Sequence, residues 1–133
     1  MAGLVLDTHA TIWYLEGSPR LSPTALAAIR TALATGDPVY VSTVTIVELT
    51  YLVEKGRFPV VLLDQLLVEL HRPNPELIVT PLDLTMAELM RSVAATIVRD
   101  MPDRMIVATA VTLSLPLVTR DRQIQACGIP VIW

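Results

Sequence analysis

Cysteine and lysine are scarce in this sequence of 133 residues, and each shortage excludes a kind of site. Cys127 is the only cysteine, which excludes an internal disulfide and a zinc site built from several thiolates, and a reducing cytoplasm is the expected location. Lys55 is the only lysine among ten basic residues, so arginine carries almost all of the positive charge. Arginine is the side chain best suited to two-pronged contacts with phosphate.

Long hydrophobic runs are also missing, although 53% of the residues are hydrophobic and the mean hydropathy is +0.56. The longest uncharged stretch, residues 105–119, has 15 residues and contains Pro116. A membrane-spanning helix needs about 18 apolar residues, so none is expected. Residues 1–9 also lack the basic residues that open a secretory signal peptide. The apolar surplus predicts a surface that a second copy or a tight protein partner covers.

The chain has no linker, repeat, low-complexity tract or charge block, and its length fits one domain over residues 1–133. Short β-rich runs alternate with longer helical stretches, which predicts an α/β fold with a parallel sheet between two layers of helices. About five short strands are expected, at Leu4–Leu6, 39–41, 77–79, 117–119 and 131–133. Helices are expected at Thr8–Glu16, 24–34, 44–55, Val60–Leu70, 85–98, 100–113 and 121–126.

Two acidic residues follow predicted strands at the point where each strand ends. Asp7 comes directly after the first strand, and Asp121 closely follows the strand at 117–119. Ligands of an open parallel sheet bind at the carboxyl ends of its strands, so these two carboxylates are candidate site residues. Simple capping of the next helix is the alternative for each of them.

Two further acids stand in predicted helices. Glu48 has apolar neighbours on its helix face, and a buried carboxylate there needs a cation, a set of hydrogen bonds or an exit to solvent. Asp103 lies in the first turn of its helix, where the helix dipole favours a negative charge, and Asp100 qualifies as the cap. Either acid taken alone therefore has a structural explanation.

Together the four acids predict a metal site. Carboxylates that share a small space raise one another's pKa unless a cation joins them, and an all-oxygen donor set suits Mg²⁺ or Mn²⁺. Such an ion supports in-line phosphoryl displacement. The net charge of −3 becomes +1 if the four acids are counted as metal ligands, so it does not exclude an RNA substrate.

Several short pieces of the sequence occur in an order that resembles a known family, the PIN-domain ribonucleases, and in particular the VapC-type toxins of type II toxin–antitoxin pairs. The pieces cover nearly the whole chain. They are LVLDTH at 4–9, VS at 41–42, VEL at 47–49, DMPDRMIVATA at 100–110, LPLVTRD at 115–121 and GIPVIW at 128–133.

The resemblance implies a metal-dependent endoribonuclease. Asp7, Glu48, Asp103 and Asp121 would be the catalytic acids and would bind one or two Mg²⁺ or Mn²⁺ ions. A metal-bound water would then hydrolyse RNA phosphodiesters to leave 5′-phosphate and 3′-hydroxyl ends. The resemblance also implies a homodimer and inhibition by a cognate antitoxin protein.

Other residues would support such a site. Ser42 and Thr119 match hydroxyl positions of the family, although either is also able to cap a turn. The family usually has Asp-Pro-Phe-Asp-Arg where this chain has Asp-Met-Pro-Asp-Arg at 100–104, so the entry to that helix differs and Asp100 remains an alternative ligand or cap. The candidates for RNA-phosphate contact are Arg20, Arg104, Arg120 and Arg122, with a structural salt bridge as the alternative for Arg104.

His9 and the apolar helices complete the set of predictions. His9 lies two residues after Asp7 and is able to approach the site, whereas His71 ends a helix. The helices at 44–55 and Val60–Leu70 are rich enough in Val and Leu to present an antitoxin groove that Trp13 and Tyr14 line, with ordinary core packing as the alternative for each residue. Two other functions stay open, a non-catalytic PIN-like interaction domain and a structure-specific DNA nuclease.

Overall fold

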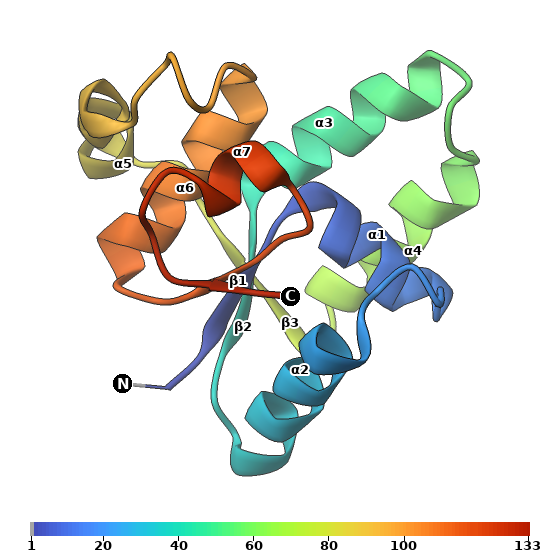
Figure 1. Ribbon diagram of the computed structural model, residues 1–133. Helices are drawn as coiled ribbons and strands as arrows, with labels where there is room; N and C mark the ends of the chain where they lie inside the picture. Colours follow the sequence, from blue (N-terminus) through green and yellow to red (C-terminus); the bar gives the residue numbers. More distant parts are fainter. Residues whose placement is uncertain (1) are drawn as a thin grey trace.

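The strands form one five-stranded parallel sheet in the computed structural model, which describes residues 2–133 (Figure 1). Its order is β3-β2-β1-β4-β5, and each neighbouring pair is parallel. The predicted α/β class is therefore confirmed. The strands are β1 (Leu4–Leu6), β2 (Val39–Ser42), β3 (Leu77–Thr80), β4 (Leu117–Val118) and β5 (Val131–Ile132).

Helices connect the strands, and polar residues mark where most of them begin. Ser22 caps α2 through its side chain and Pro23 follows at the first helical position, an arrangement that the sequence predicts. The helices are α1 (Thr8–Glu16), α2 (Pro23–Thr35), α3 (Thr43–Glu54), α4 (Val60–Leu70), α5 (Leu84–Leu89), α6 (Met101–Leu113) and α7 (Arg122–Gln125). None of the helices in residues 2–133 has the length and apolar character needed to cross a membrane.

The helix predicted at 85–98 is wrong beyond its first turns. Helix α5 ends at Leu89, a 3₁₀ turn covers Met90–Ser92, and the chain then runs irregularly to α6. The guanidinium of Arg104 donates to the carbonyls of Met90 and Val93, at 3.0 and 3.2 Å. Backbone acceptors that a longer helix would pair internally are thus satisfied by a side chain from α6. Arg104 holds this segment through those carbonyls instead of through a salt bridge.

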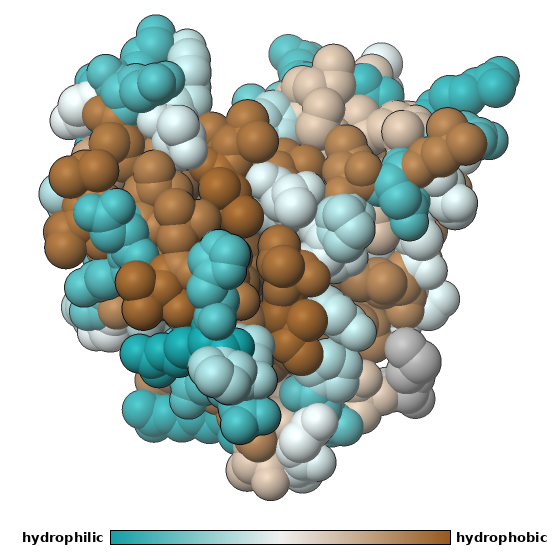
Figure 2. All heavy atoms as spheres, turned by 180° about the vertical axis from the view of Figure 1, so that it is seen from behind, coloured by the Kyte–Doolittle hydropathy of each residue, from teal (hydrophilic) through white to brown (hydrophobic). Residues whose placement is uncertain are grey.

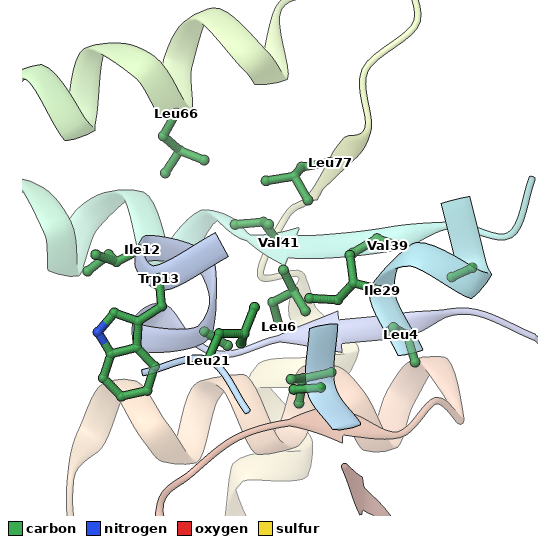
Figure 3. Close-up of a cluster of buried hydrophobic side chains, with 14 of the residues drawn as sticks. Leu4, Leu6, Ile12, Trp13, Leu21, Ile29, Val39, Val41, Leu66 and Leu77 are labelled. Atoms are coloured by element: carbon green, nitrogen blue, oxygen red, sulfur yellow. The ribbon is translucent and has the colours of Figure 1, made fainter. Parts of the chain in front are cut away.

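Two hydrophobic cores lie on opposite faces of the sheet. Successive side chains of a strand point to opposite faces, so Leu4 and Leu6 of β1 enter one core and Val5 enters the other. The first core packs α1, α2 and α4 against β1 and β2, and Figure 3 shows Trp13 at one end of this cluster. The second core contains residues of α6 and α7. The sheet therefore lies between two helical layers.

The sheet order places a crevice above β1 and β4. The chain leaves β1 for β2 and β3 on one side, and returns to β4 and β5 on the other side. At the end of β1 the Asp7 amide donates to the Val118 carbonyl of β4, at 3.2 Å. This point, where the strand order reverses, is where open α/β sheets bind ligands.

Candidate functional site

Asp7 lies at the carboxyl end of the central strand and is only 6% exposed. It caps α1, and its Oδ1 accepts a 2.8 Å hydrogen bond from the Ala10 amide. Burial raises the pKa of the Asp7 carboxyl, while the Thr119 hydroxyl, the Ala10 amide and the charge of His9 oppose that rise. A carboxylate in this position is costly to ionise without a cation beside it.

Asp121 occupies the corresponding position after the neighbouring strand β4. It caps α7 by accepting from the amides of Gln123 and Ile124, at 2.8 and 3.0 Å. The buried Thr119 hydroxyl accepts from the Asp121 amide at 3.0 Å, which fixes the turn between strand and acid. The two strand-end acids therefore cap helices and also lie at one edge of the sheet.

Glu48 is held by hydroxyl groups rather than lying free on its helix. The Thr8 hydroxyl donates to Glu48 Oε1 at 2.6 Å, and Thr8 Oγ1 also lies 3.1 Å from the Thr45 hydroxyl. Both threonines are buried. The sequence predicts that this carboxylate needs a cation, hydrogen bonds or solvent. Thr8 of α1 supplies a hydrogen bond to Glu48 of α3.

Asp103 lies in the first turn of α6, after the Asp100 cap. The Asp103 amide donates to Asp100 Oδ2 at 3.2 Å, and Pro102 is accommodated in the first turn, where its missing amide hydrogen costs little. Burial, first of all, and the negative charges of four neighbours together raise the pKa of the Asp103 carboxyl to about 7. Those neighbours are Asp100, Asp121, Glu48 and Asp7.

One cavity of 670 Å³ collects these carboxylates from four helices and two strand ends. Its acidic lining consists of Asp7, Glu48, Asp100, Asp103 and Asp121. The remaining lining consists of His9, Trp13, Arg120, Arg122 and Gln123. Figure 1 shows α1, α3 and α7 gathered near the end of β1, and residues from the starts or bodies of these helices line the cavity.

Some of the other residues that the sequence proposes for the site line this cavity, and others do not. Two of the four candidate arginines, Arg120 and Arg122, line it, whereas Arg20 does not. Ser42 is fully buried and its hydroxyl accepts from the Val44 amide, so it caps α3 outside the cavity lining. His9 lines the cavity, as the sequence predicts.

The carboxylates of the cavity form no ion pair with a side chain of residues 2–133. The one ion pair in that part of the chain joins Arg72 to Glu69, away from the cavity lining. In the same residues no three His, Cys, Asp or Glu side chains converge closely enough to hold an ion as they stand. The oxygen-only donors, and the raised pKa values of Asp7 and Asp103 among them, nevertheless fit a hard divalent ion, for which the carboxylates must draw together.

The structure has a large apolar groove beside α3. A 700 Å³ groove runs between α3 and the start of α6, and its apolar lining includes Val47, Tyr51, Pro102 and Met105. A groove between α3 and α4 stays a prediction: Leu62 and Leu66 of α4 are buried in the core, while Val60, Val61 and Val68 of the same helix are exposed. Trp13 is buried at the acidic cavity, and the Tyr14 hydroxyl donates to Glu76 at 2.8 Å.

Sequence reasoning missed the role of Thr8 and the placement of Trp13. Thr8 follows Asp7 directly, but its partner Glu48 is forty residues away. Trp13 looks like a core or groove residue in the sequence, and only the folded chain brings it beside Arg120.

Comparison with known proteins identifies the family. The model of the PIN domain matches residues 4–129, so the chain belongs to the PIN domain family. This confirms the resemblance that the sequence motifs indicate. No curated protein sequence matches the chain.

Solved structures agree with that assignment. DNA-bound VapBC from Salmonella typhimurium is similar with a TM-score of 0.70 and 25% identity, over 98% of this chain and 97% of that one. FitAcB from Neisseria gonorrhoeae is similar with a TM-score of 0.63 and 25% identity, over 96% and 95% of the chains. VapBC2 from Rickettsia felis, bound to a promoter DNA fragment, is similar with a TM-score of 0.71 over 97% of this chain and 96% of that one. At 13% identity this likeness shows the fold alone.

Proposed function

We propose that this chain is a Mg²⁺- or Mn²⁺-dependent endoribonuclease and the toxin component of a VapC-type toxin–antitoxin pair. The observation that carries the proposal is the convergence of Asp7, Glu48, Asp103 and Asp121 on one cavity. These acids come from parts of the chain up to 114 residues apart. The pKa of Asp103 is raised to about 7, and the charges of the other three acids contribute to that rise. Membership of the PIN domain family supports the same conclusion.

In this proposal the four acids hold one or two ions, with Asp100 beside them at the rim. When bound, such an ion supplies Lewis acidity toward a phosphodiester and makes water easier to deprotonate. Asp7 and Asp121 are oriented by the helices that they cap. Glu48 is oriented by the Thr8 hydroxyl. The raised pKa of Asp103 means that ion binding near neutral pH is accompanied by release of a proton from this carboxyl.

Two arginines in the cavity lining would receive the RNA backbone. Arg120 and Arg122 are exposed and line the cavity, so their guanidinium groups are available for phosphate oxygens. The Thr119 hydroxyl fixes the turn that carries Asp121, because it accepts a hydrogen bond from the Asp121 amide. The two candidate phosphate contacts, Arg120 and Arg122, therefore flank the acid Asp121 in one short segment.

A toxin of this kind needs a protein partner, and the apolar groove between α3 and α6 supplies a surface for one. Val47 is 69% exposed and Tyr51 is 55% exposed on α3, which is unusual for residues of this size and polarity. Figure 2 shows hydrophobic residues spread over much of the face seen from behind. We propose that a second copy of the chain or the antitoxin covers such surface. Two of the similar structures are named as toxin–antitoxin proteins, a toxin–antitoxin complex from Klebsiella pneumoniae and VapBC-5 of the VapBC family from Mycobacterium tuberculosis.

The test is cleavage of end-labelled RNA by the purified full chain. We expect discrete products with 5′-phosphate and 3′-hydroxyl ends in Mg²⁺ or Mn²⁺, and no products in EDTA or with Asp7→Asn. Asparagine keeps the cap of α1, so this variant removes charge without removing the helix start. Cleavage of branched or hairpin DNA with RNA left intact would favour a DNA nuclease. Cleavage that persists in EDTA would contradict the proposed mechanism.

A further inference from the structure

Three side chains form an aromatic and cationic wall of the acidic cavity, here called the Trp13 wall: His9, Trp13 and Arg120. We infer that His9 stacks on an unpaired base of the RNA substrate while Arg120 contacts the adjoining phosphate, with Trp13 as the support that positions both. This inference rests on the proposed function and names the residues that select single-stranded RNA at the same site.

Trp13 is a support rather than a contact, because its indole is almost entirely buried. It is 7% exposed and belongs to the core cluster of α1, α2 and β1, where Figure 3 shows it at one end. The Trp133 ring lies 5.8 Å from it, centre to centre. A side chain fixed on several sides has little freedom, so groups resting on it are held in place before a ligand arrives.

His9 rests on this support with its imidazole open to solvent. Its ring centre lies 5.5 Å from that of Trp13, at 50° between planes, and 6.4 Å from that of Phe58 in an edge-on arrangement. A histidine that served only to fill the core would be buried between those rings, yet His9 is exposed and lines the cavity. An oriented aromatic ring at the edge of a cavity is the usual platform for an unpaired base.

Arg120 contacts the same indole. Its guanidinium carbon lies 5.8 Å from the Trp13 ring centre, within the range of a cation–π contact. This contact holds the charged group without neutralising it. Among the residues that line the cavity, only Arg120 and Arg122 carry a permanent positive charge, against five carboxylates. A polyanion is therefore drawn to this wall and repelled from the rest of the cavity.

The two arms of the wall grow from the same strand ends as the acids. His9 follows Asp7 by two residues, and Arg120 directly precedes Asp121. Strands β1 and β4 are neighbours, with Leu6 opposite Val118. A base stacked on His9 is consequently placed beside the acids, with its phosphate toward Arg120. Double-stranded RNA keeps its bases inside the helix and lacks the face that His9 needs.

The experiment measures binding without cleavage. Every protein carries Asp7→Asn and is titrated in Mg²⁺ with a fluorescent single-stranded hexaribonucleotide, and separately with an abasic ribose-phosphate hexamer. The test variants are His9→Ala, His9→Phe, Arg120→Ala and Arg120→Lys. The controls are His71→Ala and Arg30→Ala, exposed residues at the C-cap of α4 and on α2, outside the cavity lining. Thermal unfolding of each variant reports folding.

We expect His9→Ala to weaken binding of the hexaribonucleotide about tenfold and to leave the abasic hexamer unaffected, with His9→Phe restoring the affinity. Arg120→Ala should weaken both ligands, and Arg120→Lys should recover the abasic hexamer better than the base-bearing one. Equal affinities for wild-type His9 and His9→Ala in folded protein would overturn the inference, as would equal losses for both ligands. With Asp7 intact, RNA cleavage whose KM is unchanged by His9→Ala would contradict the role of the Trp13 wall and leave the nuclease proposal standing. Base-dependent binding without any cleavage would defeat the nuclease and spare the wall.

Discussion

The hydroxyl of Thr8 donates a 2.6 Å hydrogen bond to the carboxylate of Glu48, across forty residues of sequence and between two helices. Thr8 is buried at the start of α1, one residue after Asp7. The bond therefore ties the acid on α3 to the turn that carries the acid of β1. The geometry of the cavity therefore depends on a residue that is not itself a candidate ligand.

Removing that bond should loosen the metal site. We predict that Thr8→Val, which keeps the size and removes the hydroxyl, lowers Mg²⁺ affinity and RNA cleavage by about tenfold or more. Thr8→Ser should recover most of both, because it restores the donor. Calorimetric titration of metal and initial cleavage rates are the measurements. The account fails here if the valine variant stays folded and binds Mg²⁺ as the wild type does.

Stability of the metal-free protein should depend on pH through Asp103. Its pKa of about 7 in the folded chain lies above the ordinary value of 3.8, so the protonated form is favoured by folding. The resulting stabilisation is complete below about pH 4 and is lost as the pH rises through 7. The raised pKa of Asp7 acts in the same direction. In EDTA the protein should therefore be more stable at pH 5 than at pH 8.

Asp103→Asn isolates that contribution. Because Asp103 is partly solvated, we predict a gain of only about 1 kcal/mol in the free energy of unfolding at pH 8. The gain should vanish near pH 4, where the wild-type carboxyl is already neutral. Urea unfolding in EDTA at the two pH values measures it. An asparagine variant that is no more stable than the wild type at pH 8 would show that the carboxyl is not strained there.

The groove between α3 and α6 should be separable from folding. Val47 is 69% exposed, so Val47→Asp is expected to change the unfolding free energy by no more than about 0.5 kcal/mol. The same change should abolish any self-association or antitoxin binding that buries α3, since it places a charge in an apolar contact. Val111→Asp, at an exposed position near the end of α6, is the matched control. Sedimentation velocity shows the assembly state, and an assembly untouched by Val47→Asp would place the interface on another face.

The fold could be predicted from sequence wherever neighbouring residues decide the structure. The helix at Val60–Leu70 and the strand at Leu4–Leu6 have the predicted bounds, because hydrophobic spacing and flanking turn residues specify them. Asp7 and Asp121 could be placed at one edge because parallel strands end together. The segment after Leu89 could not be predicted, since its backbone carbonyls are paired by Arg104 from a later helix.

The side-chain contacts within the cavity could not be predicted from the sequence for the same reason. Thr8 and Glu48, or Trp13 and Arg120, are far apart in sequence and meet only through the packing of whole helices and strands. Patterns of residue type indicate which groups carry chemistry, but not which side chain rests on which.

The most direct measurement of the central claim is Mn²⁺ binding to the full chain, followed by electron paramagnetic resonance of the free ion. We predict saturable binding that is strongly weakened by Asp7→Asn and by Asp121→Asn, and left intact by Asp83→Asn. Asp83 also caps a helix, α5, but lies outside the cavity lining, so it controls for loss of a capping carboxylate. Equal Mn²⁺ binding by the wild type and the Asp7 variant, both folded, would contradict the assignment of this cavity as the metal site.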